Sequence, residues 1–184
     1  MIATAFGIAG VWLTVKENIL CFPIGIINVV LYAWLFLRSR LYADAGLQIV
    51  YIVLLAYGWY QWLNKKSADP QSPVSTTEKK TWIMLLVICG VSTVTLGFFL
   101  RSNTDASLPY VDSLTTSMSL VAQWMVAKKK IENWLVWIAA DIIYVGMYIF
   151  KHLYLTTILY SVFILLAIAG WIRWRKEWTE YVHQ

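Results

Sequence analysis

The sequence predicts an all-α integral membrane protein with seven transmembrane helices, and three observations lead to that prediction. Hydrophobic residues make up 60% of the 184 residues and charged residues only 14%, whereas soluble domains have about 45–50% and about 25%. The mean hydropathy is +0.63. The apolar residues form continuous runs near the roughly 20 residues that a spanning helix needs, not the alternating segments of about ten residues typical of an outer-membrane barrel.

Polar breaks separate the runs and set the bounds of each expected span. The first run is short, but no Lys or Arg precedes Lys16 and no small-residue cleavage pattern follows it, so it reads as a span and not as a signal peptide. The expected spans are 2–15, 19–37, 43–63, 81–100, 108–127, 131–150 and 153–174.

The loops between these spans divide the basic residues unequally. Four Lys or Arg residues fall on the side of the N-terminus and eleven on the other side. Because basic loops stay in the cytoplasm, the N-terminus is expected outside and the C-terminus inside. The longest loop, residues 64–80 (NKKSADPQSPVSTTEKK), combines prolines, serines and charges, so it reads as a flexible cytoplasmic linker.

Two segments on either side of that linker resemble each other. Residues 41–62 (LYADAGLQIVYIVLLAYGWYQW) and 153–174 (LYLTTILYSVFILLAIAGWIRW) share the opening Leu-Tyr, an internal leucine and the closing Gly-Trp with a further Trp. Tyr32 matches Tyr144 at the same spacing. We therefore expect a 3+1+3 parallel repeat, as in some transporters: a first repeat over 1–63, the linker, a connecting fourth helix over 81–100, and a second repeat with a short tail over 101–184.

Polar residues in the middle of a span are functional candidates, because they are costly in hydrocarbon. Asn28 and Asp141 lie at the middle of spans two and six. Span six places an aromatic wall on the same helical face as Asp141, since the steps between these residues are three and four. The face consists of Trp134, Trp137, Asp141, Tyr144 and Tyr148.

Two further polar stripes are expected to meet this face in one cavity. Span five carries Asp112, Thr116, Ser119 and Gln123, and span three carries Asp44, Gln48 and Tyr51. Aromatic faces stack on planar rings and attract a cationic ring by about 2 kcal/mol when water is excluded. Asp44 and Asp112 lie near the outer surface, where solvation or helix capping explains them equally well. Interfacial belts are the expected role of Trp12, Trp59, Trp62, Trp171 and Trp174.

Several function classes lack their motifs in this sequence. There is no GxxxxGK[ST], HExxH or GxGxxG. The two cysteines and two histidines offer neither a disulfide framework nor a metal site. We expect no enzyme activity, no cofactor, no metal and no nucleic-acid partner. A membrane enzyme would need Asp44, Asp112 and Asp141 to cooperate.

Four segments resemble the PnuC family of bacterial vitamin transporters. They are ENWLVWIAAD (132–141), RLYADAGLQ (40–48), AYGWYQW (56–62) and VDSLTTSMSLVA (111–122). The resemblance covers nearly the whole chain. It implies a seven-helix fold related to the SWEET sugar transporters, an inner-membrane location and a homotrimer. It also implies facilitated diffusion of a water-soluble B-vitamin, which a cytoplasmic kinase traps by phosphorylation.

The resemblance also suggests a substrate. Nicotinamide riboside transporters of this family carry two tryptophans three apart and an asparagine four residues later. Here Trp134 and Trp137 match, but the third position is Asp141. Members with aspartate there resemble the branch associated with thiamine, so the prediction is thiamine, with nicotinamide riboside as the alternative. The expected binding residues are Trp134, Trp137, Asp141, Tyr144, Tyr148, Gln123, Ser119, Thr116, Asn28, Gln48 and Tyr51.

The expected mechanism is a uniporter in which two three-helix halves rock around a central site. Two alternatives stay open at this point. Proton symport through Asp141 is the first, because a buried carboxylate can titrate. The second is a membrane protein that binds a vitamin without moving it.

Overall fold

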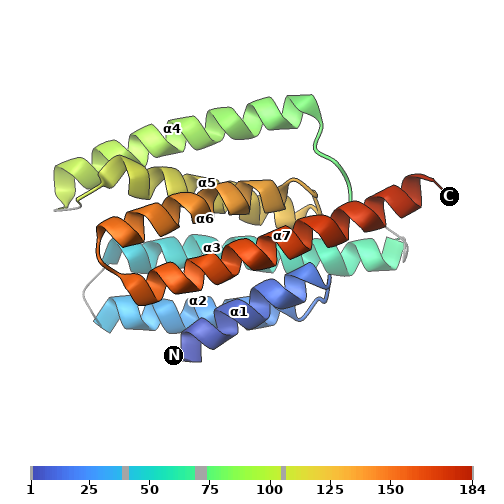
Figure 1. Cartoon of the computed structure of the whole chain (residues 1–184), viewed down its shortest axis with the longest axis horizontal. Helices are drawn as coiled ribbons and strands as arrows, with labels where there is room; N and C mark the ends of the chain where they lie inside the picture. Colours follow the sequence, from blue (N-terminus) through green and yellow to red (C-terminus); the bar gives the residue numbers. More distant parts are fainter. Residues whose placement is uncertain (1, 39–41, 69–73, 105–106, 184) are drawn as a thin grey trace.

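The computed structural model describes residues 2–38, 42–68, 74–104 and 107–183, which form seven α-helices and no strand (Figure 1). The all-α prediction is therefore confirmed. The helices are α1 (Ile2–Val15), α2 (Cys21–Arg38), α3 (Tyr42–Ala68), α4 (Lys79–Asn103), α5 (Pro109–Ala127), α6 (Asn133–Phe150) and α7 (Tyr154–Val182).

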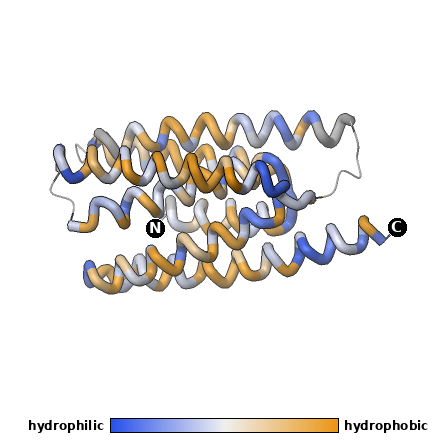
Figure 2. The backbone as a smooth tube through the Cα atoms, turned by 90° about the horizontal axis from the view of Figure 1, so that it is seen from above, coloured by the Kyte–Doolittle hydropathy of each residue, from blue (hydrophilic) through white to orange (hydrophobic). Residues whose placement is uncertain are grey.

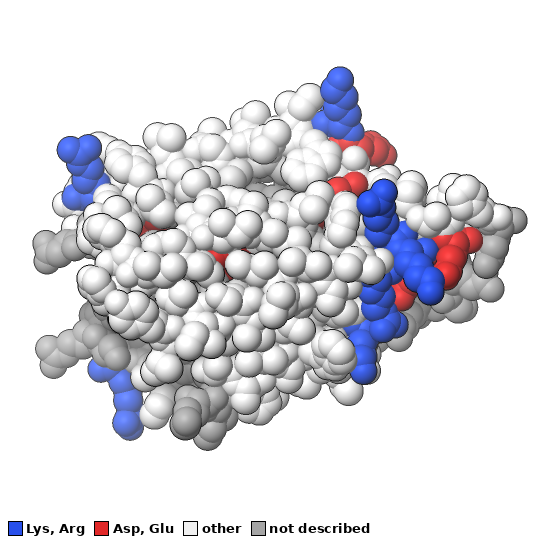
Figure 3. All heavy atoms as spheres, in the orientation of Figure 1, with Lys and Arg blue, Asp and Glu red and all other residues white. Residues whose placement is uncertain are grey.

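The surface of this bundle is that of a membrane protein. Four helices, α2, α4, α6 and α7, are long and apolar enough to cross a bilayer, and α1 contains a shorter apolar stretch. Apolar residues dominate the middle of the helices (Figure 2), and Lys and Arg gather at the two ends of the molecule (Figure 3). α5 carries four small polar residues, Ser113, Thr115, Ser117 and Ser119, whose side chains are buried inside the bundle.

Six of the helices form a closed ring. Helix α1 packs against α2, α2 against α3, α3 against α5, α5 against α6, α6 against α7, and α7 against α1. Among the described residues, α4 packs only against α5, so it lies outside the ring (Figure 1). In this order α2 and α6 occupy opposite positions, as do α1 with α5 and α3 with α7. The centre of the ring is therefore reached by side chains from both halves of the chain.

Two helices extend further than the sequence predicts. α3 continues to Ala68 and α7 to Val182, because helical backbone can continue into water with polar residues after the apolar run ends. The expected linker, residues 64–80, is thus partly helical, and residues 69–73 lie outside the described part. After residue 73 the chain packs against the α5–α6 connection. Ser75 and Lys130 form an isolated β-bridge there, and Val74 is buried.

Residues 112 positions apart share several structural features. Glu17 and Lys129, in the α1–α2 and α5–α6 connections, have positive φ angles of 51° and 54°. Two edge-on aromatic contacts lie at one end of the ring and two stacked contacts toward the other end. These are Phe22–Trp62 and Trp134–Trp174, with centroids 5.0 and 5.3 Å apart, and Tyr32–Phe36 and Tyr144–Tyr148, with centroids 5.9 and 5.8 Å apart.

The expected belt role is wrong for two of the tryptophans. Trp62 and Trp174 are 1% and 0% exposed, and their rings contact each other with centroids 6.3 Å apart. The indole nitrogen of Trp62 donates a hydrogen bond to the carbonyl oxygen of Val126 at 3.1 Å. Both residues lie several residues before the ends of α3 and α7, and their side chains belong to the hydrophobic core. Trp12, by contrast, is 45% exposed.

Glycine is required where these aromatics meet the helices. A Cβ atom at Gly58 would lie 2.5 Å from Phe22 Cε1, and one at Gly170 would lie 2.5 Å from Trp134 Cε2. Such distances are shorter than van der Waals contact allows. The rings at these two matched positions therefore rest directly on the backbone of α3 and α7.

This contact predicts that Gly170→Ala destabilises the protein by about 1–3 kcal/mol, the usual cost of overpacking a core. Gly90→Ala is the matched control, because no atom lies within 4 Å of a Cβ at that exposed position of α4. Thermal unfolding of detergent-purified protein measures both variants. A lower Tm for Gly170→Ala and an equal or higher one for Gly90→Ala are expected; equal values for the two variants would contradict the contact.

Candidate functional site

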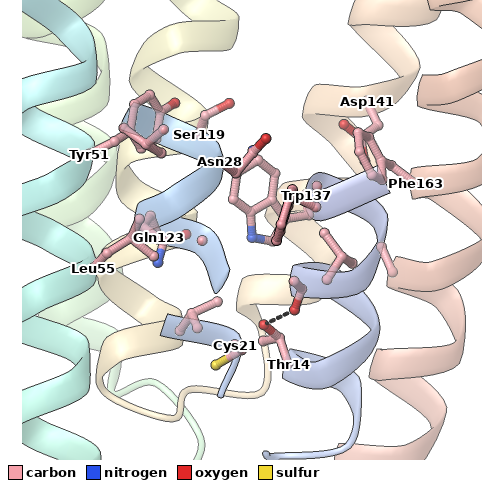
Figure 4. Close-up of a pocket in the computed structure, with 18 of the residues that line it drawn as sticks. Thr14, Cys21, Asn28, Tyr51, Leu55, Ser119, Gln123, Trp137, Asp141 and Phe163 are labelled. Carbon is pink, nitrogen blue, oxygen red and sulfur yellow. Dashed lines mark hydrogen bonds between the residues drawn. The ribbon is translucent and has the colours of Figure 1, made fainter. Parts of the chain in front are cut away.

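The ring encloses a cavity of about 320 Å³. That volume lies at the small end of the about 300–1,000 Å³ typical of small-molecule sites. All six ring helices contribute to its wall. Figure 4 shows Trp137 in the middle of this cavity, with Gln123 to one side, Asp141 and Phe163 to the other, and Thr14 and Cys21 below.

Nine of the eleven residues expected to bind substrate line this cavity. They are Asn28, Gln48, Tyr51, Ser119, Gln123, Trp134, Trp137, Asp141 and Tyr144. Thr116 and Tyr148 are not among the lining residues, because each lies about one helical turn beyond the cavity, past Ser119 and Tyr144 respectively. Asp112 is paired with Lys151 at 3.5 Å outside the cavity. The side chain of Asp44 lies outside the described part.

Asp141 is the most unusual residue of the wall. It is only 3% exposed, and it forms no hydrogen bond or ion pair with any residue that the structure describes. A buried charge without a partner is costly, so a carboxylate in this place is satisfied by a ligand, a water molecule or a proton.

A second wall residue also offers an unused polar atom. The side-chain oxygen of Asn28 is buried and has no hydrogen-bond partner among the described residues. Most buried acceptors in proteins are paired. Asn28 and Asp141 therefore provide two acceptors, from α2 and α6, for donors or positive charge inside the cavity.

Aromatic side chains close one end of the cavity, near the α1–α2 and α5–α6 connections. The Trp134 ring is wedged between Gly170 and the edge of Trp174, and it is 2% exposed. Phe22 and Trp62 form the matching contact from the other half of the chain. Together these rings separate the cavity from the end of the molecule.

An ion pair lies at this same end. The Lys129 Nζ is 2.7 Å from a carboxylate oxygen of Glu17, and the two side chains are 11% and 18% exposed. Lys129 also sits over the Trp62 ring, 4.9 Å from its centroid. Burial alone would raise the pKa of the Glu17 carboxyl, but hydrogen bonds with Glu177 and Lys129 and the charge of Lys129 hold its pKa below the ordinary value. The ion pair is therefore charged at neutral pH.

Tyrosines close the opposite end. Tyr144 and Tyr160 line the cavity with ring centroids 4.7 Å apart, and Tyr148 packs behind them, 5.8 Å from Tyr144 and 5.0 Å from Tyr160. The predicted face of α6 is thus real, but its last member contributes to this tyrosine cluster and not to the cavity wall.

Helices α1 and α7 also contribute to the cavity wall, although the polar and aromatic stripes of the sequence did not indicate them. α1 lines the cavity with Phe6, Gly7, Gly10, Val11 and Thr14, and α7 with Tyr160, Phe163 and Ala167. The internal similarity contained a signal for two of them. Tyr160 and Phe163 occupy the positions 112 residues after Gln48 and Tyr51, which were expected in the site.

A multi-pass helical membrane protein with a ligand-sized cavity at the centre of its helix ring has the architecture of a small-molecule transporter. Residues 1–176 match the family model described as nicotinamide mononucleotide transporter. The chain belongs to this family. It is a transporter of the bacterial inner membrane and not an enzyme, and the resemblance to PnuC proteins is confirmed.

Curated relatives and a solved structure agree with this assignment. The nicotinamide riboside transporter PnuC of Escherichia coli is 25% identical over 96% of this chain and 85% of its own length. The riboflavin/roseoflavin transporter RibM of Streptomyces davaonensis is 23% identical over 96% and 86%. The crystal structure of the vitamin B3 transporter PnuC has the same fold, with a TM-score of 0.75 and 21% identity over 96% of this chain and 80% of that one.

Proposed function

We propose that the protein carries a cationic, ring-containing B-vitamin across the membrane by facilitated diffusion through the central cavity. The observation that supports this most is the buried, unpaired Asp141 one helical turn from Trp137. A carboxylate attracts a positive charge strongly where water is excluded, and an indole face adds up to about 2 kcal/mol of cation–π attraction.

In this proposal the cavity residues make three kinds of contact with the vitamin. Trp137 and Tyr144 stack on the rings of the vitamin, with Trp134 as the floor beneath them. Asp141 pairs with a positive or amino group. The amides of Asn28, Gln48 and Gln123 form hydrogen bonds with the polar edge, and Ser119 and Tyr51 complete the wall.

Nicotinamide riboside is the better supported substrate, because curated relatives of the chain carry that name. Thiamine, the substrate that the sequence predicted, is a second candidate because of the residue at position 141. Asp141 stands where the nicotinamide riboside branch has asparagine, and thiamine combines a permanent thiazolium charge with an aminopyrimidine donor. Both vitamins are cations with separate rings.

Transport in this proposal is a rocking of two three-helix halves, α1–α3 and α5–α7, around the cavity. The features shared by residues 112 positions apart support a parallel repeat of these halves, with α4 as the connection. The ends of the cavity would open alternately: one at the Glu17–Lys129 pair and its aromatic rings, the other at the tyrosine cluster. Proton symport through Asp141 and binding without transport are the competing mechanisms.

Orientation and assembly are also proposals. Figure 3 shows more Lys and Arg at one end of the bundle than at the other. This is the end of the Glu17–Lys129 pair, where the charge of Arg173 in α7 acts on Glu17 and is followed along the helix by Arg175 and Lys176. The excess of Lys and Arg supports placing that end in the cytoplasm. A homotrimer and trapping by a cytoplasmic kinase stay predictions from the family resemblance.

Asp141→Asn tests the substrate. Removing one charge from a desolvated pair typically costs about 2–5 kcal/mol, so we expect the Kd for thiamine to rise at least about tenfold. Nicotinamide riboside is also a cation, but asparagine is the residue of its branch, so affinity for that vitamin should fall less than affinity for thiamine. Isothermal titration of wild type and variant with both vitamins measures this.

Asp112→Asn is the matched control, because Asp112 pairs with Lys151 outside the cavity. It should leave both affinities within about twofold. Unchanged thiamine binding by Asp141→Asn would remove thiamine as a candidate. A wild-type protein that binds neither vitamin would contradict the proposed function.

Charge reversal tests the proposed gate. Cys21 lines the cavity near the ion pair and is 5% exposed, so in a Cys89→Ser background its labelling by a maleimide reports opening of this end. Glu17→Lys leaves two positive charges in contact, and Lys129→Glu leaves two negative ones. Each should speed the labelling several-fold, because a partly buried pair is stabilised more than an exposed one.

The double variant Glu17→Lys with Lys129→Glu is the control for this experiment. It reverses the pair but restores its attraction, so labelling should return toward the wild-type rate. If the single variants were labelled as slowly as wild type, the ion pair would have no part in closing this end.

A further inference from the structure

The two halves of the chain contribute unlike side chains to the same cavity. Lining residues occur in pairs that are 112 positions apart, either on α1 or α2 with α5 or α6, or on α3 with α7. In four such pairs a glycine or an aliphatic residue in the first position is matched by a polar or aromatic residue in the second. The pairs are Gly7 with Ser119, Val11 with Gln123, Gly25 with Trp137, and Val29 with Asp141.

Gly25 and Trp137 form the most unequal pair. They lie on α2 and α6, which occupy opposite positions in the ring, and both line the cavity. The largest side chain on one wall therefore corresponds to no side chain on the other. If both positions carried tryptophan, the second ring would project into the cavity that the first one lines.

Gly25 lines the cavity and packs closely against Leu55 of α3. The three atoms nearest to a Cβ at this position all belong to Leu55, at 3.1 to 3.9 Å, and none belongs to Trp137. Leu55 is itself a lining residue, and its contacting atoms are the free end of a flexible side chain. A substituent at Gly25 would therefore displace the end of the Leu55 side chain by a few tenths of an ångström, and the two side chains together would reduce the volume available to a ligand.

Asp141 indicates that this volume receives a ligand. Asp141 is 3% exposed, lies one turn from Trp137 on the same wall, and forms no hydrogen bond or ion pair with a described residue. A ring stacked on Trp137 with its charge near Asp141 must extend toward the opposite wall, which is the wall at Gly25.

We propose that Gly25 is a specificity-determining residue: the ring of the substrate occupies the space that Gly25 leaves opposite Trp137. This inference rests on the proposed function and adds a size limit to it. The cavity of about 320 Å³ accepts vitamins with separate one-ring systems, such as nicotinamide riboside and thiamine. On this proposal the fused three-ring system of riboflavin is too wide for the space between Trp137 and Gly25, although a relative is named a riboflavin transporter.

Titration of Gly25 variants with the three vitamins tests the proposal. Gly25→Leu fills the space and should raise the Kd of the bound vitamin at least about tenfold, within the range over which pocket shape discriminates ligands. Gly25→Ala should raise it by about threefold or more. Gly146→Leu, on the open side of α6 where nothing lies within 4 Å of a Cβ, should change it less than twofold. Wild type should not bind riboflavin.

Thermal unfolding in the absence of ligand shows whether each variant is folded. If Gly25→Leu does not fold, Gly25→Ala decides the test. A folded Gly25 variant that binds like wild type would overturn the role of Gly25 and leave the proposed function intact. Riboflavin binding by wild type would overturn the size limit. If wild type bound none of the three vitamins, both the inference and the proposed function would be wrong.

Discussion

The packing of four aromatic rings at one end of the helix ring is the contact on which the rest of the structure depends. Phe22 meets Trp62 edge-on, Trp134 meets Trp174 in the same way, and the two tryptophans of α3 and α7 touch each other. These contacts join the two halves of the chain and form the floor of the cavity. They are possible because Gly58 lets the ring of Phe22 approach the backbone of α3, and Gly170 lets the ring of Trp134 approach the backbone of α7.

The ion pair completes this closed end. Glu17 and Lys129 both adopt a left-handed backbone conformation, which costs a non-glycine residue about 1–2 kcal/mol. Their opposite charges and the contact of Lys129 with Trp62 offset that cost. Residues at matched positions of the two halves thus pair with each other, which places the pair where the proposed halves would separate. Asp141 differs from them, since its charge has no partner among the described residues.

Much of the fold follows from the sequence, because apolar runs and polar breaks reflect the bilayer directly. The order of the helices and the first residues of α1 and α5 could be predicted from these patterns alone. The ends of α3 and α7 could not be predicted in this way, because the apolar run ends at the membrane surface while the helical backbone hydrogen bonds continue beyond it. The same limit explains the error at Trp62 and Trp174: a tryptophan near the end of an apolar run looks like an interfacial residue, and only tertiary packing reveals it as core.

The candidate site was predictable where helical periodicity defines a face. The steps of three and four on α6 identified Trp137, Asp141 and Tyr144 as one wall. Periodicity says which side of a helix is used, but not how far along it the cavity extends, so Thr116 and Tyr148 were included although they lie beyond it. Glycines such as Gly25 carry no signal of their own in a sequence. Their meaning appears only when the opposite wall is known.

Uptake by purified protein in liposomes tests the central claim, that this cavity is a passive route for a vitamin. With radiolabelled nicotinamide riboside or thiamine outside and no ion gradient, the vitamin should equilibrate across the membrane and not exceed the outside concentration. A kinase and ATP trapped inside should convert this equilibration into accumulation. Binding without entry would contradict transport, and accumulation without the kinase that depends on an imposed proton gradient would contradict the passive mechanism.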